Sequence, residues 1–189
     1  ITNEGRTEGY VVFQQARGAN HIRVRDLALL TAASAARLLK FFADHRSVIE
    51  TVSWNGPPND PLAFANNEEE VNRSRVSDWM VRIVDVDTAL EGRGYPPALE
   101  AELHLEVKDD LLPWNSGRYI LRVIGGNGVV TKGGNGEISM DIRGLAAMYT
   151  GHMTPSELNR FGVLDGPEEQ LLRASLVFSG PRPWLAEQF

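Results

Sequence analysis

The segment Trp79–Pro96, WMVRIVDVDTALEGRGYP, constrains the fold more than any other part of the chain. Its first half, residues 79–86, alternates branched apolar residues with polar ones, which is typical of a half-buried strand. Asp87 then opens the run ALEGRGY as a short helix, punctuated by Gly92 and Gly94. The sequence therefore predicts a strand that leads directly into a capped helix.

The region before Trp79 has the pattern of two strands, a helix and a third strand. GYVVFQQ and HIRVRDLALL are the first two strands, and SVIETVSW contains the third. The helix is predicted over residues 31–44, with Thr31 as its N-cap. Its buried face is expected to comprise Ala35, Leu38, Leu39 and Phe42.

Residues 55–77 are dense in proline, asparagine and charged side chains, which indicates a boundary between two domains. Asn59 or Asp60 is expected to cap a short helical turn there, and the run Glu68–Glu70 is interpreted as a solvated loop rather than a metal site. The predicted domains are residues 1–76 and residues 77–189.

The second domain begins with the strictly alternating segment EAELHLEVKDD, a half-buried strand. RYILRVIGG and VVTKGG continue the pattern, and the pairs Asn127-Gly128 and Asn135-Gly136 signal two turns. These segments predict a three- to four-stranded antiparallel meander. The two GGNG motifs fit neither a dinucleotide fingerprint nor a Walker loop, so they are interpreted as hairpin turns.

Three helical segments follow these strands. They are DIRGLAAMYTG, then TPSELNRF with Thr154 as its cap, then GPEEQLLRASLVF. Strands followed by helices indicate an α+β arrangement with the helices on one face of the sheet.

Composition excludes several classes of function. The chain has no cysteine, which removes thiolate nucleophiles, disulfides and zinc-thiolate sites. Its formal net charge of -6 disfavours nucleic acid and favours a cationic partner. The four histidines lie far apart, and no apolar run approaches the length of a membrane span. We therefore expect no metal site and no membrane, and a cytoplasmic protein.

Three motifs occur in an order that resembles the three-domain GNAT N-acetyltransferases of the enhanced intracellular survival (Eis) type. They are the Trp79–Pro96 run, the segment MDIRGLAAMYTG and the terminal phenylalanine. The resemblance implies an α+β chain in which residues 1–76 are the closing, second half of a degenerate GNAT-like middle domain and residues 77–189 form a sterol-carrier-like domain. It also implies a homo-oligomer, since family members assemble as hexamers. The acetyl-CoA-binding N-terminal domain would be missing, and this chain alone would be inactive.

The turn before the predicted helix agrees with that expectation. In a cofactor-binding GNAT domain, a glycine-rich turn at this point holds the pyrophosphate of acetyl-CoA at the helix N-terminus. The corresponding turn here is LLTAAS, whose Cβ atoms would crowd a phosphate. We therefore expect no cofactor-binding residues in this chain.

The resemblance makes the α-carboxylate of Phe189 the catalytic candidate, because in the family the C-terminal carboxylate accepts a proton from the substrate amine. A frayed terminus is the alternative, but SGPRPWLAEQF carries apolar anchors behind two prolines. Gln188 stands where relatives can carry an acidic residue. The other substrate-binding candidates, each of which could instead serve the core, are Trp54, Trp79, Met80 and Arg82.

The function implied by the resemblance is transfer of an acetyl group from acetyl-CoA to amino groups of a cationic small molecule, aminoglycoside- or polyamine-like. The alternative is a sterol- or lipid-binding carrier module without catalysis, because sterol-carrier-like folds enclose an apolar tunnel. Any helix-on-sheet core requires the same apolar residues, and core packing is favoured. These residues are Leu145, Met148, Tyr149, Leu158, Phe161, Leu171, Leu172, Leu176 and Phe178.

Overall fold

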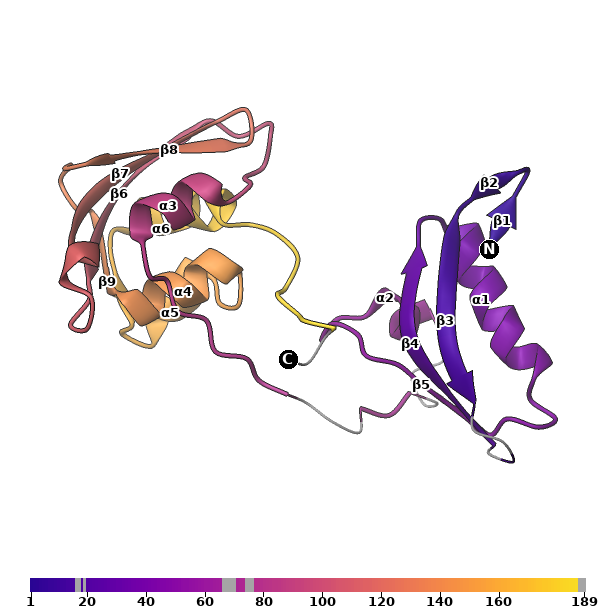
Figure 1. The fold of residues 1–189 in the computed structure, drawn as a ribbon. Coiled ribbons are helices and arrows are strands. Elements are labelled where there is room, and N and C mark those ends of the chain that lie inside the picture. Colours follow the sequence, from indigo (N-terminus) through magenta and orange to yellow (C-terminus); the bar gives the residue numbers. More distant parts are fainter. Residues whose placement is uncertain (16–17, 19, 66–70, 74–76, 187–189) are drawn as a thin grey trace. The chain divides into compact units, whose positions relative to one another are not determined.

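The chain divides into two units, which are described separately (Figure 1). The computed structural model describes residues 1–15, 18, 20–65, 71–73 and 77–186. The first unit is Ile1–Val76 together with the segment that begins at Trp184, and the second is Ser77–Pro183. The expected second domain ran from residue 77 to residue 189. The contacts instead assign the segment that begins at Trp184 to the first unit. Among the described helices, none has the length and apolar character needed to cross a bilayer.

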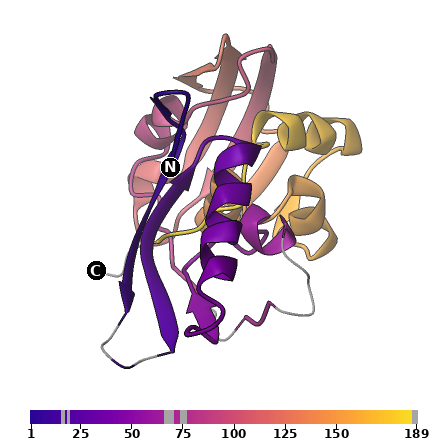
Figure 2. The same cartoon turned by 90° about the vertical axis from the view of Figure 1, so that its right-hand side faces the viewer.

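The first unit has the predicted order of two strands, a helix and a third strand. Its elements are β1 (Thr2–Asn3), β2 (Arg6–Thr7), β3 (Gly9–Gln15), β4 (His21–Leu29), α1 (Ala32–Asp44), β5 (Thr51–Ser53) and α2 (Pro61–Ala65). The sheet has the order β3-β4-β5, in which β3 and β4 are antiparallel and β4 and β5 are parallel. Helix α1 makes the crossover between the parallel strands and lies against the sheet (Figure 2). The short β1–β2 hairpin was not predicted.

Helix α1 begins as predicted, because its cap is a local property of the sequence. Thr31 is the N-cap, and its Oγ1 accepts the amide of Ser34 at 3.1 Å while Ser34 Oγ accepts the amide of Thr31 at 3.2 Å. Leu38 is buried as expected, but Ser34 and not Ala35 is the other fully buried residue of the helix. The small core beneath the helix is built on Ile22, Val24 and Ile49.

The parallel pairing of β4 with β5 is short. It joins His21–Arg23 to Thr51–Ser53, whereas β4 pairs with β3 along nearly its whole length. In the described part of the chain, no strand pairs with residues 24–29 on the β5 side. The two strands therefore diverge and leave one edge of β4 open.

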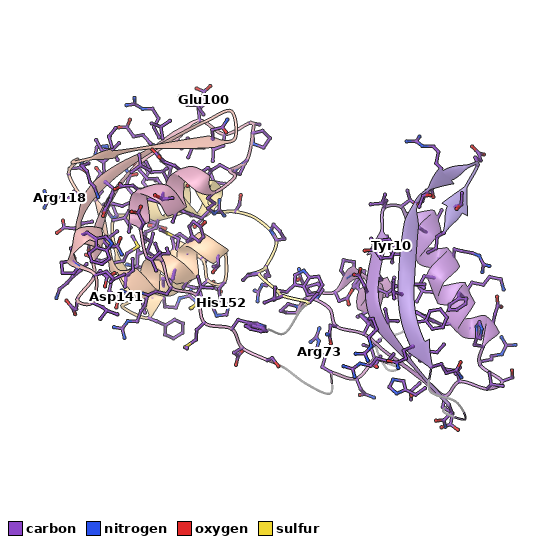
Figure 3. All side chains as sticks on the ribbon, in the orientation of Figure 1. Tyr10, Arg73, Glu100, Arg118, Asp141 and His152 are labelled. Carbon is purple, nitrogen blue, oxygen red and sulfur yellow. The ribbon has the colours of Figure 1, made fainter. Side chains whose placement is uncertain are left out.

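The second unit is a five-stranded sheet with helices on one face (Figure 1). Polar side chains such as Arg118 extend from the sheet on the side away from the helices (Figure 3). The sheet order is β10-β9-β6-β7-β8. The elements are α3 (Val86–Gly92), β6 (Ala101–Lys108), η2 (Pro113–Asn115), β7 (Gly117–Ile124), β8 (Asn127–Lys132), β9 (Ile138–Asp141), α4 (Ile142–Thr150), α5 (Pro155–Arg160), β10 (Leu164–Asp165) and α6 (Glu168–Val177).

The predicted antiparallel meander accounts for only part of this sheet. Strands β6, β7 and β8 form it, but β9 pairs in parallel with the other edge of β6. Because β8 and β9 lie on opposite sides of the β6–β7 pair, the residues between them must cross the sheet. They cross its polar face, where the Asn135 amide donates to His104 Nδ1 at 3.1 Å. The second GGNG motif is therefore a crossover and not a hairpin.

The first GGNG motif is a hairpin turn, but the turn lies two residues earlier than predicted. Gly125 and Gly126 have φ values of 57° and 84°, and Ile124 pairs with Asn127. Asn127-Gly128 thus belongs to β8. A two-residue hairpin turn that needs positive φ at both positions is least strained with glycine at both.

The strand predicted over residues 79–86 is absent from the structure, and the helix after it begins one residue before Asp87. Helix α3 is capped by Asp85, whose Oδ1 accepts the amide of Thr88 at 2.7 Å. Side chains satisfy the backbone that a neighbouring strand would otherwise pair. Trp114 Nε1 donates to the Val84 carbonyl at 2.9 Å, and the Val86 amide donates to Asn115 Oδ1 at 3.1 Å.

The RGY part of the same motif joins three elements. Arg93 donates from Nε to the Tyr149 carbonyl at 2.9 Å and from Nη2 to the Phe178 carbonyl at 3.1 Å, at the C-terminal ends of α4 and α6. A cation at this position also complements the negative ends of both helix dipoles. The guanidinium lies 5.1 Å from the ring centroid of Tyr95.

A buried carboxylate, Asp109, fastens the start of the second unit to its sheet. Arg82 Nη2 donates to its two oxygens at 2.6 and 2.7 Å, and Asn115 Nδ2 donates to Oδ2 at 3.0 Å. The amides of Leu111 and Leu112 also donate to Oδ1. Burial alone would raise the pKa of Asp109, but these hydrogen bonds outweigh it and hold that pKa well below its usual range.

The crossover predicts a sensitive glycine. Gly134 has a φ of 94°, and a Cβ there would lie 2.8 Å from His104 Nδ1 and 2.9 Å from Ile120 Cγ1. Gly134→Ala should therefore lower the free energy of unfolding by about 1–3 kcal/mol in urea denaturation. The control is Gly92→Ala, which meets no atom within 4 Å and should not destabilise. Equal unfolding midpoints for Gly134→Ala and the unmodified protein would contradict this account.

The Asp109 network predicts a stability difference that depends on pH. Because its folded-state pKa is depressed, the stabilisation is complete above the unfolded-state pKa of about 3.9 and is lost as the pH falls toward the folded-state value. Asp109→Asn should unfold at lower urea concentration than the unmodified protein at pH 7, and the difference should shrink below about pH 4. Asp110→Asn, at an exposed neighbour, is the control. A difference that stays constant with pH would refute this assignment.

Candidate functional site

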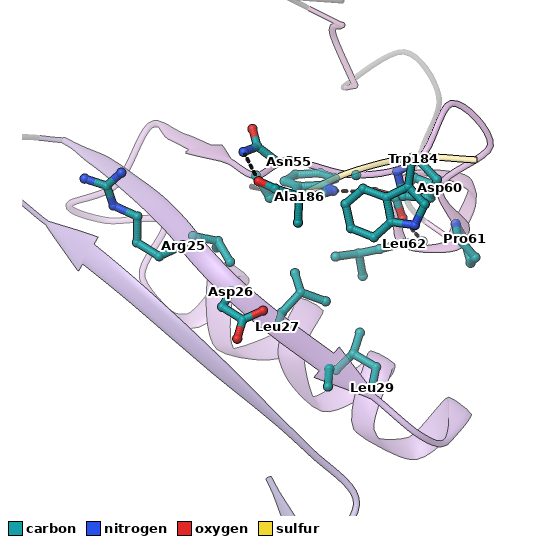
Figure 4. A pocket seen from close by; sticks show the side chains of 15 residues that line it. Arg25, Asp26, Leu27, Leu29, Asn55, Asp60, Pro61, Leu62, Trp184 and Ala186 are labelled. Carbon is teal, nitrogen blue, oxygen red and sulfur yellow. Dashed lines mark hydrogen bonds between the residues drawn. The ribbon is translucent and has the colours of Figure 1, made fainter. Parts of the chain in front are cut away.

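A cavity of about 270 Å³ lies in the first unit, along the part of β4 that β5 leaves unpaired (Figure 4). Its walls are residues 24–29 of β4, residues 54–57 and residues 60–62. Trp184 and Ala186, which are distant in sequence, complete the lining. All of these residues belong to the first unit.

Trp54, a predicted substrate-binding residue, is held in the cavity wall by Asp60. Trp54 Nε1 donates to Asp60 Oδ2 at 2.5 Å, and the Leu62 amide donates to Asp60 Oδ1 at 2.9 Å. Asp60 is thus the residue that caps α2, and its two oxygens fix both the helix and the indole. This aromatic wall is therefore rigidly positioned.

The segment from Trp184 lies on this cavity. Trp184 lines it together with Asp60 and Leu62 (Figure 4), and Asn55 Nδ2 donates to the Ala186 carbonyl at 3.3 Å. Trp184 keeps 48% of its surface exposed. One wall of the cavity is therefore a short piece of chain laid across the open side of β4.

A second carboxylate, Asp26, lies on β4 at the cavity. Tyr10 donates its hydroxyl proton to Asp26 Oδ2 at 2.7 Å, and this hydrogen bond raises the pKa of Tyr10. Asp26 and Asp60 thus both accept hydrogen bonds from the chain itself. The lining combines apolar and aromatic surface with two carboxylates that already accept hydrogen bonds from other residues of the chain. Such a lining is better suited to binding a ligand than to acid–base catalysis.

The N-terminus of α1, where a GNAT domain would hold the pyrophosphate of acetyl-CoA, does not fit that group. The Ser34 amide is already bonded to Thr31 Oγ1 in the capping box. Thr31 Oγ1 also donates to Glu8 Oε2 at 2.8 Å, which places a carboxylate beside the start of the helix. Repulsion by that carboxylate adds to the crowding expected from the side chains of the turn.

The remaining described candidates from the sequence belong to the second unit. Arg82 pairs with buried Asp109 in the second unit, so its charge is used within the fold. In the same unit Met80 is fully exposed, and Trp79 keeps 42% of its surface exposed. Gln188 and Phe189 lie outside the described residues, as does the run Glu68–Glu70.

Sequence reasoning missed Asn55 and Asp26 as parts of the cavity. Neither stands in a recognisable motif, and the partner of Asn55 is 131 residues away. Trp184 was expected to anchor the end of the chain, but its binding surface was not predictable. Within the described part of the chain, no three His, Asp or Glu side chains gather in a way that could hold a metal ion.

The residues expected either to line a lipid tunnel or to fill the core divide into two groups. Leu145, Met148, Leu158, Leu171 and Phe178 are buried in the main core of the second unit. Phe161, Leu172 and Leu176 are more than half exposed. Tyr149 is partly buried and packs against the first group. These six residues therefore pack the helices onto the sheet, as the core interpretation requires.

Comparison with known families also divides the chain into two parts, at residues 83–86, and assigns residues 184–186 to the second part and not to the first. Residues 1–83 match the acetyltransferase (GNAT) domain, and residues 86–186 match the sterol carrier protein domain. The presence of a GNAT domain does not support the expectation that the chain lacks its cofactor-binding domain altogether.

Individual relatives are N-acetyltransferases. An uncharacterized N-acetyltransferase of Streptomyces avermitilis is 28% identical over 98% of this chain and 47% of its own length. The N-acetyltransferase Eis of Mycobacterium tuberculosis is 30% identical over 88% of this chain and 41% of its own length. This chain therefore spans about half the length, or less, of these curated relatives.

A solved structure supports the same relationship. A GCN5-related N-acetyltransferase from Anabaena variabilis is 41% identical and superposes with a TM-score of 0.91, covering 98% of this chain and 48% of that protein. The chain therefore belongs to the sterol carrier protein domain family over residues 86–186, more than half of its length, and its residues 1–83 match an acetyltransferase (GNAT) domain.

Proposed function

We propose that this chain forms the middle and C-terminal part of an Eis-like N-acetyltransferase, which transfers an acetyl group from acetyl-CoA to amino groups of a cationic small molecule, aminoglycoside- or polyamine-like. The observation that carries the proposal is the return of the segment from Trp184 onto the GNAT unit. Similarity to N-acetyltransferase Eis supports the family type, and the net charge of -6 supports a cationic acceptor.

In this proposal the α-carboxylate of Phe189 acts on the acceptor amine. An amine becomes a nucleophile only after it loses its proton, and a carboxylate with a reference pKa of about 3.5 is charged at neutral pH. Such a group attracts the ammonium, orients it and, in a desolvated site, accepts its proton. Trp54, Trp79, Met80 and Gln188 remain proposed substrate contacts, whereas the pairing of Arg82 with Asp109 leaves it a supporting role.

We further propose that acetyl-CoA is held by a part of a longer protein and not by the α1 turn. This view is supported by the two hydrogen bonds of the Thr31 hydroxyl, which accepts from the Ser34 amide and donates to the Glu8 carboxylate. The greater length of the relatives also supports it. This chain alone would then be inactive. We also propose a homo-oligomer in the cytoplasm, which the exposed apolar side chains Met80, Phe161, Leu172 and Leu176 support.

The role of the terminal carboxylate can be tested by adding one glycine after Phe189 in the full-length protein that carries this chain. The addition moves the carboxylate by about 3 Å, so kcat/KM for an aminoglycoside panel should fall about 100-fold while folding stays intact. Phe189→Leu keeps the carboxylate in place and is the matched control. Unchanged activity after the addition would reject the catalytic role of this group.

The position of acetyl-CoA can be tested by calorimetric titration of coenzyme A into the 189-residue chain and into the full-length protein. We expect binding only to the full-length protein, because the side chains of the α1 turn crowd a phosphate and the Ser34 amide is already bonded to Thr31 Oγ1. Glu8→Gln in the short chain controls for simple charge repulsion and should not restore binding. Micromolar binding to the short chain would overturn this part of the proposal.

A further inference from the structure

We propose that Asn135-Gly136, in the connection between β8 and β9, is a site of spontaneous deamidation, and that the reaction loosens this connection. The sequence contains three Asn-Gly pairs, at residues 55–56, 127–128 and 135–136. The three pairs lie in different surroundings, so the structure decides which of them reacts. The reaction is independent of acetyl transfer.

The chemistry requires only the asparagine, the backbone amide after it and water. The nitrogen of that amide loses its proton and attacks Cγ of the asparagine side chain. The bond between Cγ and Nδ2 breaks, ammonia leaves with the proton that the backbone nitrogen lost, and a five-membered succinimide ring remains. Water then opens the ring at either carbonyl and yields aspartate or isoaspartate. Glycine at the second position favours the attack, because no Cβ obstructs ring closure.

The pair Asn135-Gly136 meets these requirements. It belongs to the crossover, residues 133–137, which lies outside the strands on the face of the sheet from which Arg118 extends (Figure 3). The side chain of Asn135 is exposed. In the described part of the chain, neither this side-chain amide nor the Gly136 backbone amide has a hydrogen-bond partner. Both reacting groups are therefore available.

The pair Asn127-Gly128 is restrained in three ways. Both residues belong to β8, whose pairing with β7 fixes their backbone. Asn127 Nδ2 donates to the Gly125 carbonyl at 3.2 Å. Gly128 is packed so closely that a Cβ there would lie 2.7 Å from Tyr95 Cε2 and 2.9 Å from the Leu90 carbonyl oxygen. Ring closure would have to displace these neighbours.

The pair Asn55-Gly56 is restrained at both residues. Asn55 Nδ2 donates to the Ala186 carbonyl at 3.3 Å, and a Cβ at Gly56 would overlap the Asp60 carboxylate. A hydrogen bond that must open before the attack slows the reaction by a factor of about five. A hydrogen bond and close packing together should therefore slow it by about tenfold or more.

Deamidation changes the crossover in two ways. The crossover passes over the Glu106–Arg118 ion pair, since a Cβ at Gly136 would lie 2.7 Å from Glu106 Oε2 and 3.2 Å from Arg118 Nε. A carboxylate at residue 135 adds a negative charge one residue from this contact, and Glu106 repels it. Isoaspartate also adds a methylene group to the main chain of a connection whose two ends are fixed by β8 and β9. Both changes weaken the seating of the crossover on the sheet.

The site can be tested by incubating the 189-residue chain at mildly alkaline pH and following each Asn-Gly pair by peptide mass spectrometry. We expect Asn135 to deamidate about tenfold faster than Asn127 and Asn55. The matched control is the same chain in urea, where the restraints on Asn127 and Asn55 are removed and the three rates should converge. Equal rates in the folded chain would overturn the assignment, and so would a difference that persists in urea.

The loosening of the crossover can be tested by urea denaturation of fresh and incubated protein. Incubated protein should unfold at a lower urea concentration, and fresh Asn135→Asp should reproduce the part of this shift that is due to charge. Asn135→Gln keeps a neutral amide but would have to close a six-membered ring, so its midpoint should not change on incubation. If Asn135 deamidates without a shift in the midpoint, or if Asn135→Gln shifts equally, the loosening is rejected while the site stands.

Discussion

The parallel pairing of β4 with β5 lasts only three residues, and the functional features of the first unit depend on where it stops. Continued pairing would close the edge of β4 and leave no room for the cavity. Because the strands diverge, Trp54 and Asp60 can form a separate wall, and a segment from far along the sequence can complete the enclosure. The same unit presents a carboxylate, Glu8, at the start of α1.

In the second unit, topology decides which residues are needed at particular positions. Since β8 and β9 flank the β6–β7 pair, their connection crosses the polar face of the sheet, and Gly134 allows the backbone to approach His104 closely. The helices on the other face are joined at their C-terminal ends by Arg93, which donates to two carbonyls. The motif that resembles the Eis family therefore has a structural role in holding helices α4 and α6 to the segment after α3.

Features set by neighbouring residues were predictable from the sequence, and those set by distant residues were not. The capping box at Thr31 and the alternation of β6 follow from local chemistry. The alternation over residues 79–86 predicted a strand, but no sheet edge is available there and side chains from residues 114–115 satisfy the backbone instead. Two other features also depend on residues distant in sequence and could not be predicted from a local pattern. They are the parallel pairing of β6 with β9 and the pairing of Arg82 with Asp109. The contact of Asn55 with Ala186, 131 residues apart, is the extreme case.

The assignment of the segment from Trp184 to the first unit also has a consequence for biosynthesis. The chain leaves the ribosome N-terminal end first, and residues 77–183 stand between the two pieces of the first unit. Residues 77–183 are therefore all synthesised before Trp184 and Ala186, which complete the cavity lining of the first unit. During translation the first unit therefore has only residues 1–76 to fold with, and its cavity is completed only when the residues after Pro183 have been made.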